Sequence, residues 1–159
     1  MALDQKDKEL AAIGASIGTG CLPCIEHHIP AGRDAGLTEP ELAPAVEVAD
    51  ATHRIAAELL FGRSRELLHG AEAPASVPLQ AEPTSRPDEL VALGASVGAN
   101  CHPLLEQHIA GALKQGLTAS QVRSAIKMAE IVQQHAANIT AGKAAAFIEA
   151  AGLNPAAVS

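Results

Sequence analysis

Apolar residues recur along this 159-residue chain at intervals of three and four positions, the period of a helix that packs by one face. Two segments show the pattern most clearly, with apolar positions at Leu10, Ile13 and Ile17 and again at Leu90, Leu93 and Val97. Alanine, the best helix former, occupies 34 positions. The pattern predicts an all-α protein.

The sequence repeats itself after 80 residues. Residues 9–57 align with residues 89–137 without a gap, and 19 of these 49 pairs are identical. Similarity at one fixed period indicates two copies of a supersecondary unit. We therefore predict a tandem of one helical unit, with its two copies packed about a pseudo-two-fold axis because each copy alone buries little surface.

Four prolines separate the two copies and predict an extended linker, because they break helices; they stand at positions 74, 78, 83 and 87. The predicted organisation is a first helical repeat at residues 1–70, a linker at 71–87 and a second repeat at 88–159. The linker is expected to wrap around the outside of the packed copies.

Each copy is predicted to contain three helices. The second helix ends at Gly36 or Gly116, since glycine readily adopts the left-handed conformation that stops a helix. Capping-box sequences at 38–41 and 118–121 then start a third, longer helix.

Composition and charge exclude several classes of function. The formal charge of −7, without any run of Lys or Arg, argues against binding to nucleic acid, and two Phe with no Trp or Tyr leave almost no platform for base stacking. No apolar segment approaches the length of a membrane span. The charged N-terminus lacks the apolar core of a signal peptide, so we expect a cytoplasmic protein in a reducing compartment.

The candidate chemistry lies in the sequence Cys21-Leu22-Pro23-Cys24, four residues before His28. Pro23 favours the first turn of a helix, which places both sulfurs beside the positive end of a helix dipole. Cys21, Cys24 and His28 then share one helix face, where the imidazole can accept a thiol proton. A Cys-x-x-Cys pair in a reducing compartment indicates catalysis or metal binding.

These residues resemble a known family. Glu9, Cys21-x-x-Cys24, His28 and the following Gly-x-Thr-x-x-Glu at 36–41 are similar to the alkylhydroperoxidase D-like branch of the carboxymuconolactone decarboxylase superfamily. The resemblance covers both copies. It implies an all-helical scaffold on which Glu9, Cys21, Cys24 and His28 form a catalytic proton-relay site that reduces peroxide or disulfide bonds, with no cofactor or metal and with an external dithiol as reductant.

The second copy departs from this pattern. Glu89, Cys101 and His108 match the motif, but Leu104 replaces the second cysteine. The second copy cannot form the dithiol, so only the first copy is expected to be a redox centre. Cys101 is expected to be a small buried residue rather than a reactive thiol.

Three alternatives accompany this interpretation. One is a lactone decarboxylase of the same superfamily, which uses non-redox acid and base groups, and another is a non-enzymatic metal- or partner-binding scaffold. Zinc would be held by Cys21 and Cys24 with His27, His28 or His53, although no second Cys-x-x-Cys is present. A Gly-x-Ser-x-Gly hydrolase motif also occurs at 14–18 and 94–98, but no predicted strand precedes it.

The remaining expectations concern other histidines and assembly. His27, His53, His69, His102 and His135 are expected to be surface or capping residues. Ala-rich helices with few aromatic residues leave a thin core, so the chain is expected to form a homo-oligomer, and the resemblance implies a trimer of two-copy chains.

Overall fold

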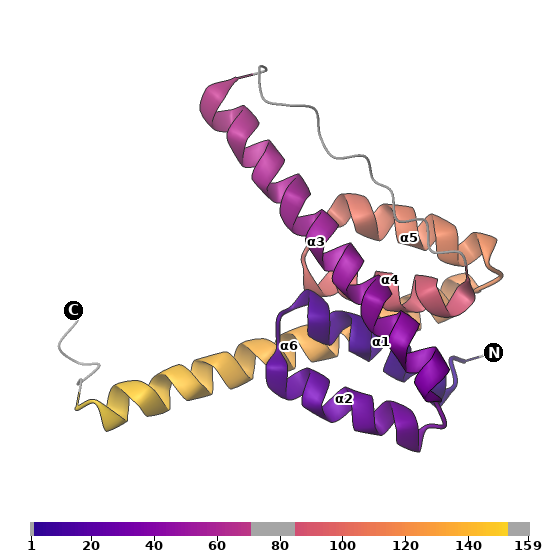
Figure 1. The fold of residues 1–159 in the computed structure, drawn as a ribbon, viewed down its shortest axis with the longest axis horizontal. Coiled ribbons are helices and arrows are strands. Elements are labelled where there is room, and N and C mark those ends of the chain that lie inside the picture. Colours follow the sequence, from indigo (N-terminus) through magenta and orange to yellow (C-terminus); the bar gives the residue numbers. More distant parts are fainter. Residues whose placement is uncertain (1, 71–84, 153–159) are drawn as a thin grey trace.

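The computed structural model describes residues 2–70 and 85–152, which form six α-helices and no strand. The helices are α1 (Gln5–Gly18), α2 (Leu22–Asp34), α3 (Glu39–His69), α4 (Arg86–Gly98), α5 (His102–Lys114) and α6 (Ala119–Ala150) (Figure 1). Three helices in each copy confirm the predicted all-α tandem. Most of the predicted linker, residues 71–84, lies outside the described residues, and the division into 1–70, 71–87 and 88–159 stays a prediction.

The predicted helix ends are confirmed by backbone geometry. Gly36 and Gly116 follow α2 and α5 with φ of +95° and +86°, a conformation that side chains with a Cβ rarely adopt. At the start of α6, the Gln121 N–H donates to Thr118 Oγ1 and the Thr118 N–H donates to Gln121 Oε1. At the start of α3, hydrogen bonds from Thr38 lower the pKa of Glu41.

The two copies meet where α1 crosses α4 in the centre of the molecule. A Cβ on Gly14 would collide with the carbonyl oxygen of Val91, and a Cβ on Gly94 would collide with that of Ala11. Because Val91 and Gly94 lie 80 residues after Ala11 and Gly14, these contacts are reciprocal, as a two-fold axis requires. The largest apolar cluster draws on both copies, so neither copy has a separate core.

Each third helix packs against the first helices of both copies. α3 and α6 both contact α1 and α4. Figure 1 shows that the C-terminal parts of α3 and α6 continue beyond the central pair. The long third helix of each copy therefore packs on the first helix of the other copy as well as on its own.

An ion pair also joins the copies, at the beginning of α4. The Arg86 guanidinium donates from Nη1 to Asp7 Oδ1 at 2.7 Å and from Nη2 to Asp7 Oδ2 at 2.5 Å. Asp7 is buried, and its hydrogen bonds raise the pKa of Arg86. The fork-shaped contact holds α4 in place on α1.

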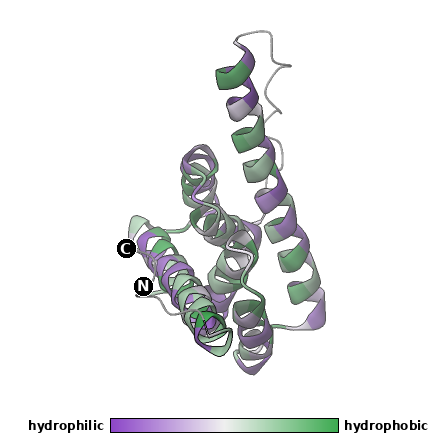
Figure 2. Ribbon diagram, turned by 90° about the vertical axis from the view of Figure 1, so that its left-hand side faces the viewer, coloured by the Kyte–Doolittle hydropathy of each residue, from purple (hydrophilic) through white to green (hydrophobic). Residues whose placement is uncertain are grey.

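Exposed apolar side chains gather on the far ends of both third helices, and they include Leu60, Phe61, Leu67, Leu68, Phe147 and Ile148. Figure 2 shows apolar positions continuing along the projecting part of α3. Leu67 and Leu68 align with Phe147 and Ile148 in the repeat, so the two copies share this feature. None of the described helices is long and apolar enough to cross a membrane.

We predict that Gly94→Ala destabilises the protein by about 2 kcal/mol or more, because the added methyl group meets backbone that cannot move aside freely. Gly142→Ala in α6 is the control, since a Cβ there meets nothing within 4 Å. That change is expected to stabilise the helix by up to about 1 kcal/mol. Urea unfolding of the two variants checks this, and equal stabilities would contradict the close crossing.

We also expect the purified chain to self-associate, as a trimer, because the exposed apolar ends of α3 and α6 are better covered by other copies than by water. Light scattering coupled to size-exclusion chromatography measures the mass directly. A stable monomer at micromolar concentration would overturn this expectation.

Candidate active site

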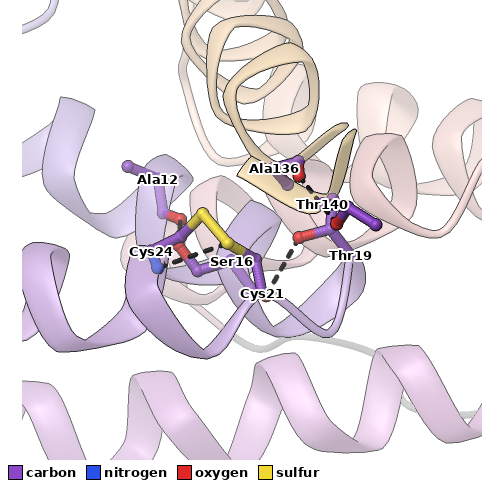
Figure 3. Close-up of a disulfide and its surroundings, with 7 residues drawn as sticks. All are labelled: Ala12, Ser16, Thr19, Cys21, Cys24, Ala136 and Thr140. Atoms are coloured by element: carbon purple, nitrogen blue, oxygen red, sulfur yellow. Dashed lines mark hydrogen bonds between the residues drawn. A yellow bond between two sulfur atoms is a disulfide. The ribbon is translucent and has the colours of Figure 1, made fainter. Parts of the chain in front are cut away.

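The two cysteines of the first copy lie at the beginning of α2. Cys21 is the N-cap residue and Cys24 lies in the first turn, joined to it by a disulfide with a Cα–Cα distance of 5.2 Å (Figure 3). The Cys24 N–H donates to Cys21 Sγ at 3.3 Å. The same donor and the helix dipole favour negative charge on that sulfur once the bond is reduced.

Glu9 and His28 form a hydrogen-bonded pair between α1 and α2. The nitrogen Nδ1 of His28 lies 2.9 Å from Glu9 Oε2, and because an ionised carboxylate only accepts, Nδ1–H is the donor. The two atoms are close enough for a direct hydrogen bond, so no water molecule bridges them. The His28 side chain is 15% exposed and that of Glu9 is 7% exposed, so water still reaches the imidazole.

Gln5 completes this arrangement, and sequence reasoning missed it. Its Nε2 donates to Glu9 Oε1 at 2.7 Å, so each carboxylate oxygen has its own partner. The spacing of four residues between Gln5 and Glu9 on one helix was the available signal. In the second copy the aligned residue is Ser85, which caps α4 by accepting from the Asp88 N–H.

The disulfide is covered by the second copy. Cys21 and Cys24 belong to an apolar cluster with Ala129, Val132 and Ala136 of α6. Figure 3 shows α6 passing beside the disulfide, with Ala136 and Thr140 on the near part of the helix. The sulfur-bearing residues are consequently 8% and 2% exposed, and Cys21 is the more accessible of the two.

The corresponding place in the second copy is closed. His108 Nδ1 donates to Glu89 Oε2 at 3.0 Å, and the two side chains are only 2% and 5% exposed. Cys101, the residue at the N-cap position of α5, is a free and buried thiol, and Leu104 is fully buried. A Cβ on Gly111 would collide with the Glu89 carboxylate, so this carboxylate packs directly against the backbone of α5.

The sequence profile of the carboxymuconolactone decarboxylase family matches residues 1–61 and 85–147, one segment in each copy. The chain belongs to this family. Searches of curated proteins and of solved structures give no significant match. The two matched segments agree with the tandem of helical units. Membership of the family does not distinguish redox chemistry from decarboxylase chemistry.

Of the other histidines in this family member, His53 serves the fold and the rest are exposed. His53 Nδ1 lies 3.1 Å from the carbonyl oxygen of Gly18, so it caps the end of α1 as expected. His27, His69, His102 and His135 are exposed. Across residues 2–70 and 85–152, no group of three or more His, Cys, Asp or Glu side chains is arranged to hold a metal ion.

The Gly-x-Ser-x-Gly segments serve packing. Ser16 and Ser96 are buried inside helices, and their hydroxyls donate to the carbonyl oxygens of Ala12 and Ala92 at 2.7 Å. The hydrolase motif needs its serine on a sharp turn after a strand. Neither serine is placed for nucleophilic attack.

The two Glu–His pairs are predicted to differ in their importance for stability. Glu89→Ala should cost about 3 kcal/mol, because it leaves the buried His108 without its acceptor and opens a cavity. Glu9→Ala should cost about 1 kcal/mol, because water can reach His28. Chemical denaturation of both variants measures the difference, and a larger loss in Glu9→Ala would contradict the burial of the second pair.

Proposed function

We propose that the first copy is a thiol-dependent peroxidase or disulfide reductase that uses Cys21 and Cys24. The proposal rests on the pairing of these cysteines at the N-terminus of α2. The same helix carries His28, whose imidazole is hydrogen-bonded to Glu9. A helix N-terminus favours a thiolate, and a nearby histidine held by a carboxylate is suited to accept and return protons. Glu9, His28, Cys21 and Cys24 are the proposed catalytic residues.

In the reductive direction, one thiolate attacks a peroxide oxygen and breaks the O–O bond. The products are a cysteine sulfenic acid and an alcohol, or water if the substrate is hydrogen peroxide. The second thiol then attacks the sulfenic sulfur, water leaves, and the Cys21–Cys24 disulfide forms. With a disulfide substrate, attack gives a mixed disulfide and releases one thiol, and the second cysteine then resolves the mixed disulfide and releases the other thiol.

Glu9 and His28 serve the proton transfers in this scheme. Since Nδ1–H of His28 is directed to Glu9, the other ring nitrogen, Nε2, is the one that takes the proton of the attacking thiol and gives it to the leaving oxygen or sulfur. Gln5 acts as a positioning residue by holding the free carboxylate oxygen of Glu9. An external dithiol then reopens the disulfide and is itself oxidised, which completes the cycle.

We predict that Cys21→Ser and Cys24→Ser each abolish turnover, because one sulfur attacks and the other resolves the intermediate. Cys101→Ser is the matched control and should retain most activity, since this buried thiol has no second cysteine beside it. Peroxide consumption and disulfide reduction with the same dithiol reductant are the assays. Turnover that persists in Cys24→Ser would refute the dithiol mechanism, and lactone decarboxylation by that variant would favour the non-redox alternative.

His28→Ala and Glu9→Gln are predicted to slow turnover by about ten- to ten-thousand-fold, the usual range for loss of a positioned proton-transfer group. The loss in His28→Ala should shrink as pH rises, because hydroxide then forms the thiolate without a base. Glu89→Gln in the second copy is the control. If it slows turnover as much as Glu9→Gln, the assignment of the relay to the first copy is wrong.

A further inference from the structure

The structure places a helix of the second, dithiol-free copy directly on the disulfide of the first. Ala129, Val132 and Ala136 of α6 pack in one apolar cluster with Cys21 and Cys24. Met128 and Ile139 flank the same cluster. The cover is provided by α6, whose covering residues lie more than 100 residues after the cysteines in sequence.

The cover leaves little room at the sulfurs. Cys24 is almost completely buried, and Cys21 retains only a small exposed area. Cys21 is therefore the residue of the pair that an exchanging molecule reaches more easily. Ala136, on the part of α6 beside the disulfide (Figure 3), belongs to the same apolar cluster and also retains a small exposed area.

We infer that α6 sets the size limit for molecules that react at Cys21–Cys24, with Ala136 as the specificity-determining residue. The inference rests on the proposed function for its biological meaning, but the steric claim concerns only access to the disulfide. Small oxidants and reductants should pass beside the alanine methyl group, while a bulky molecule should already be hindered. The second copy thus contributes the substrate-facing wall of a site whose chemistry it lacks.

The repeat supplies a matched control. Ala56 of α3 aligns with Ala136 and is similarly buried, but it packs against Cys101 and Leu104 of the second copy. The same substitution at Ala56 imposes the same change of volume on an equivalent helix contact, away from the disulfide.

The experiment measures reduction of the Cys21–Cys24 disulfide by two free thiols, 2-mercaptoethanol and the larger glutathione, with alkylation and mass spectrometry as readout. Ala136→Leu is expected to slow reduction by glutathione about ten-fold more than reduction by 2-mercaptoethanol, in line with the selectivity of a tight apolar contact. Ala56→Leu is expected to leave the ratio of the two rates unchanged. Equal slowing of both thiols by Ala136→Leu, or the same selectivity in Ala56→Leu, would overturn the inference.

A second pair of variants keeps the test decisive if leucine is not tolerated in the packed cluster. Ala136→Gly should raise the glutathione rate selectively, because it removes the methyl group beside the disulfide, and Ala56→Gly should not. A glycine here costs up to about 1 kcal/mol of helix stability, so the fold is retained. An unchanged rate ratio in Ala136→Gly would also overturn the inference.

These rates are measured without peroxide and so separate the two proposals. If the Ala136 variants change size selectivity but the protein turns over neither peroxide nor disulfide substrates, the inference about α6 stands and the proposed function is wrong. If the wild type turns over substrate but no Ala136 variant changes the size selectivity, the proposed function stands and the inference about α6 is wrong.

Discussion

The close approach of α1 and α4 is the constraint on which the rest of the structure depends. Two helices can bring their backbones this close only where no Cβ stands between them, and Gly14 and Gly94 meet that condition at equivalent positions of the two copies. The crossing merges both copies into one core built largely from alanine and leucine. It also directs α3 and α6 across the partner copy, which brings α6 onto the disulfide and α3 onto Cys101.

The duplicated motif has two different physical environments. In the first copy, Gln5 donates a hydrogen bond to Glu9 Oε1, the carboxylate oxygen that does not contact His28. The imidazole of His28 remains within reach of water. In the second copy, glycine at position 111 replaces the alanine at 31, the Glu89 carboxylate packs against α5, and the pair is sealed. A proton relay must exchange protons with its surroundings, whereas a hydrogen-bonded pair that is closed to water serves mainly to fix two helices. The same residue types thus leave one pair within reach of water and fix the other inside the packing.

Much of this arrangement could be predicted from the sequence, because it depends on local rules. The helix ends follow from glycine and capping-box chemistry around Gly36 and Thr118, and the 80-residue register made the pairing of two helical units predictable. Contacts between distant segments could not be read in this way. The packing of Ala136 against the cysteines is such a contact, since it depends on where a helix of the other copy crosses. The hydrogen bond from Gln5 to Glu9, by contrast, had a local signal in their spacing of four residues.

The central claim is that the oxidation chemistry of the chain is confined to one pair of sulfurs, and a single-turnover experiment tests it most directly. Fully reduced protein receives one equivalent of hydrogen peroxide, and peptide mass spectrometry maps all three cysteines. The account predicts one Cys21–Cys24 disulfide for each peroxide consumed, with Cys101 still a thiol. Consumption of peroxide that leaves Cys21 and Cys24 reduced, or that oxidises Cys101 first, would contradict it.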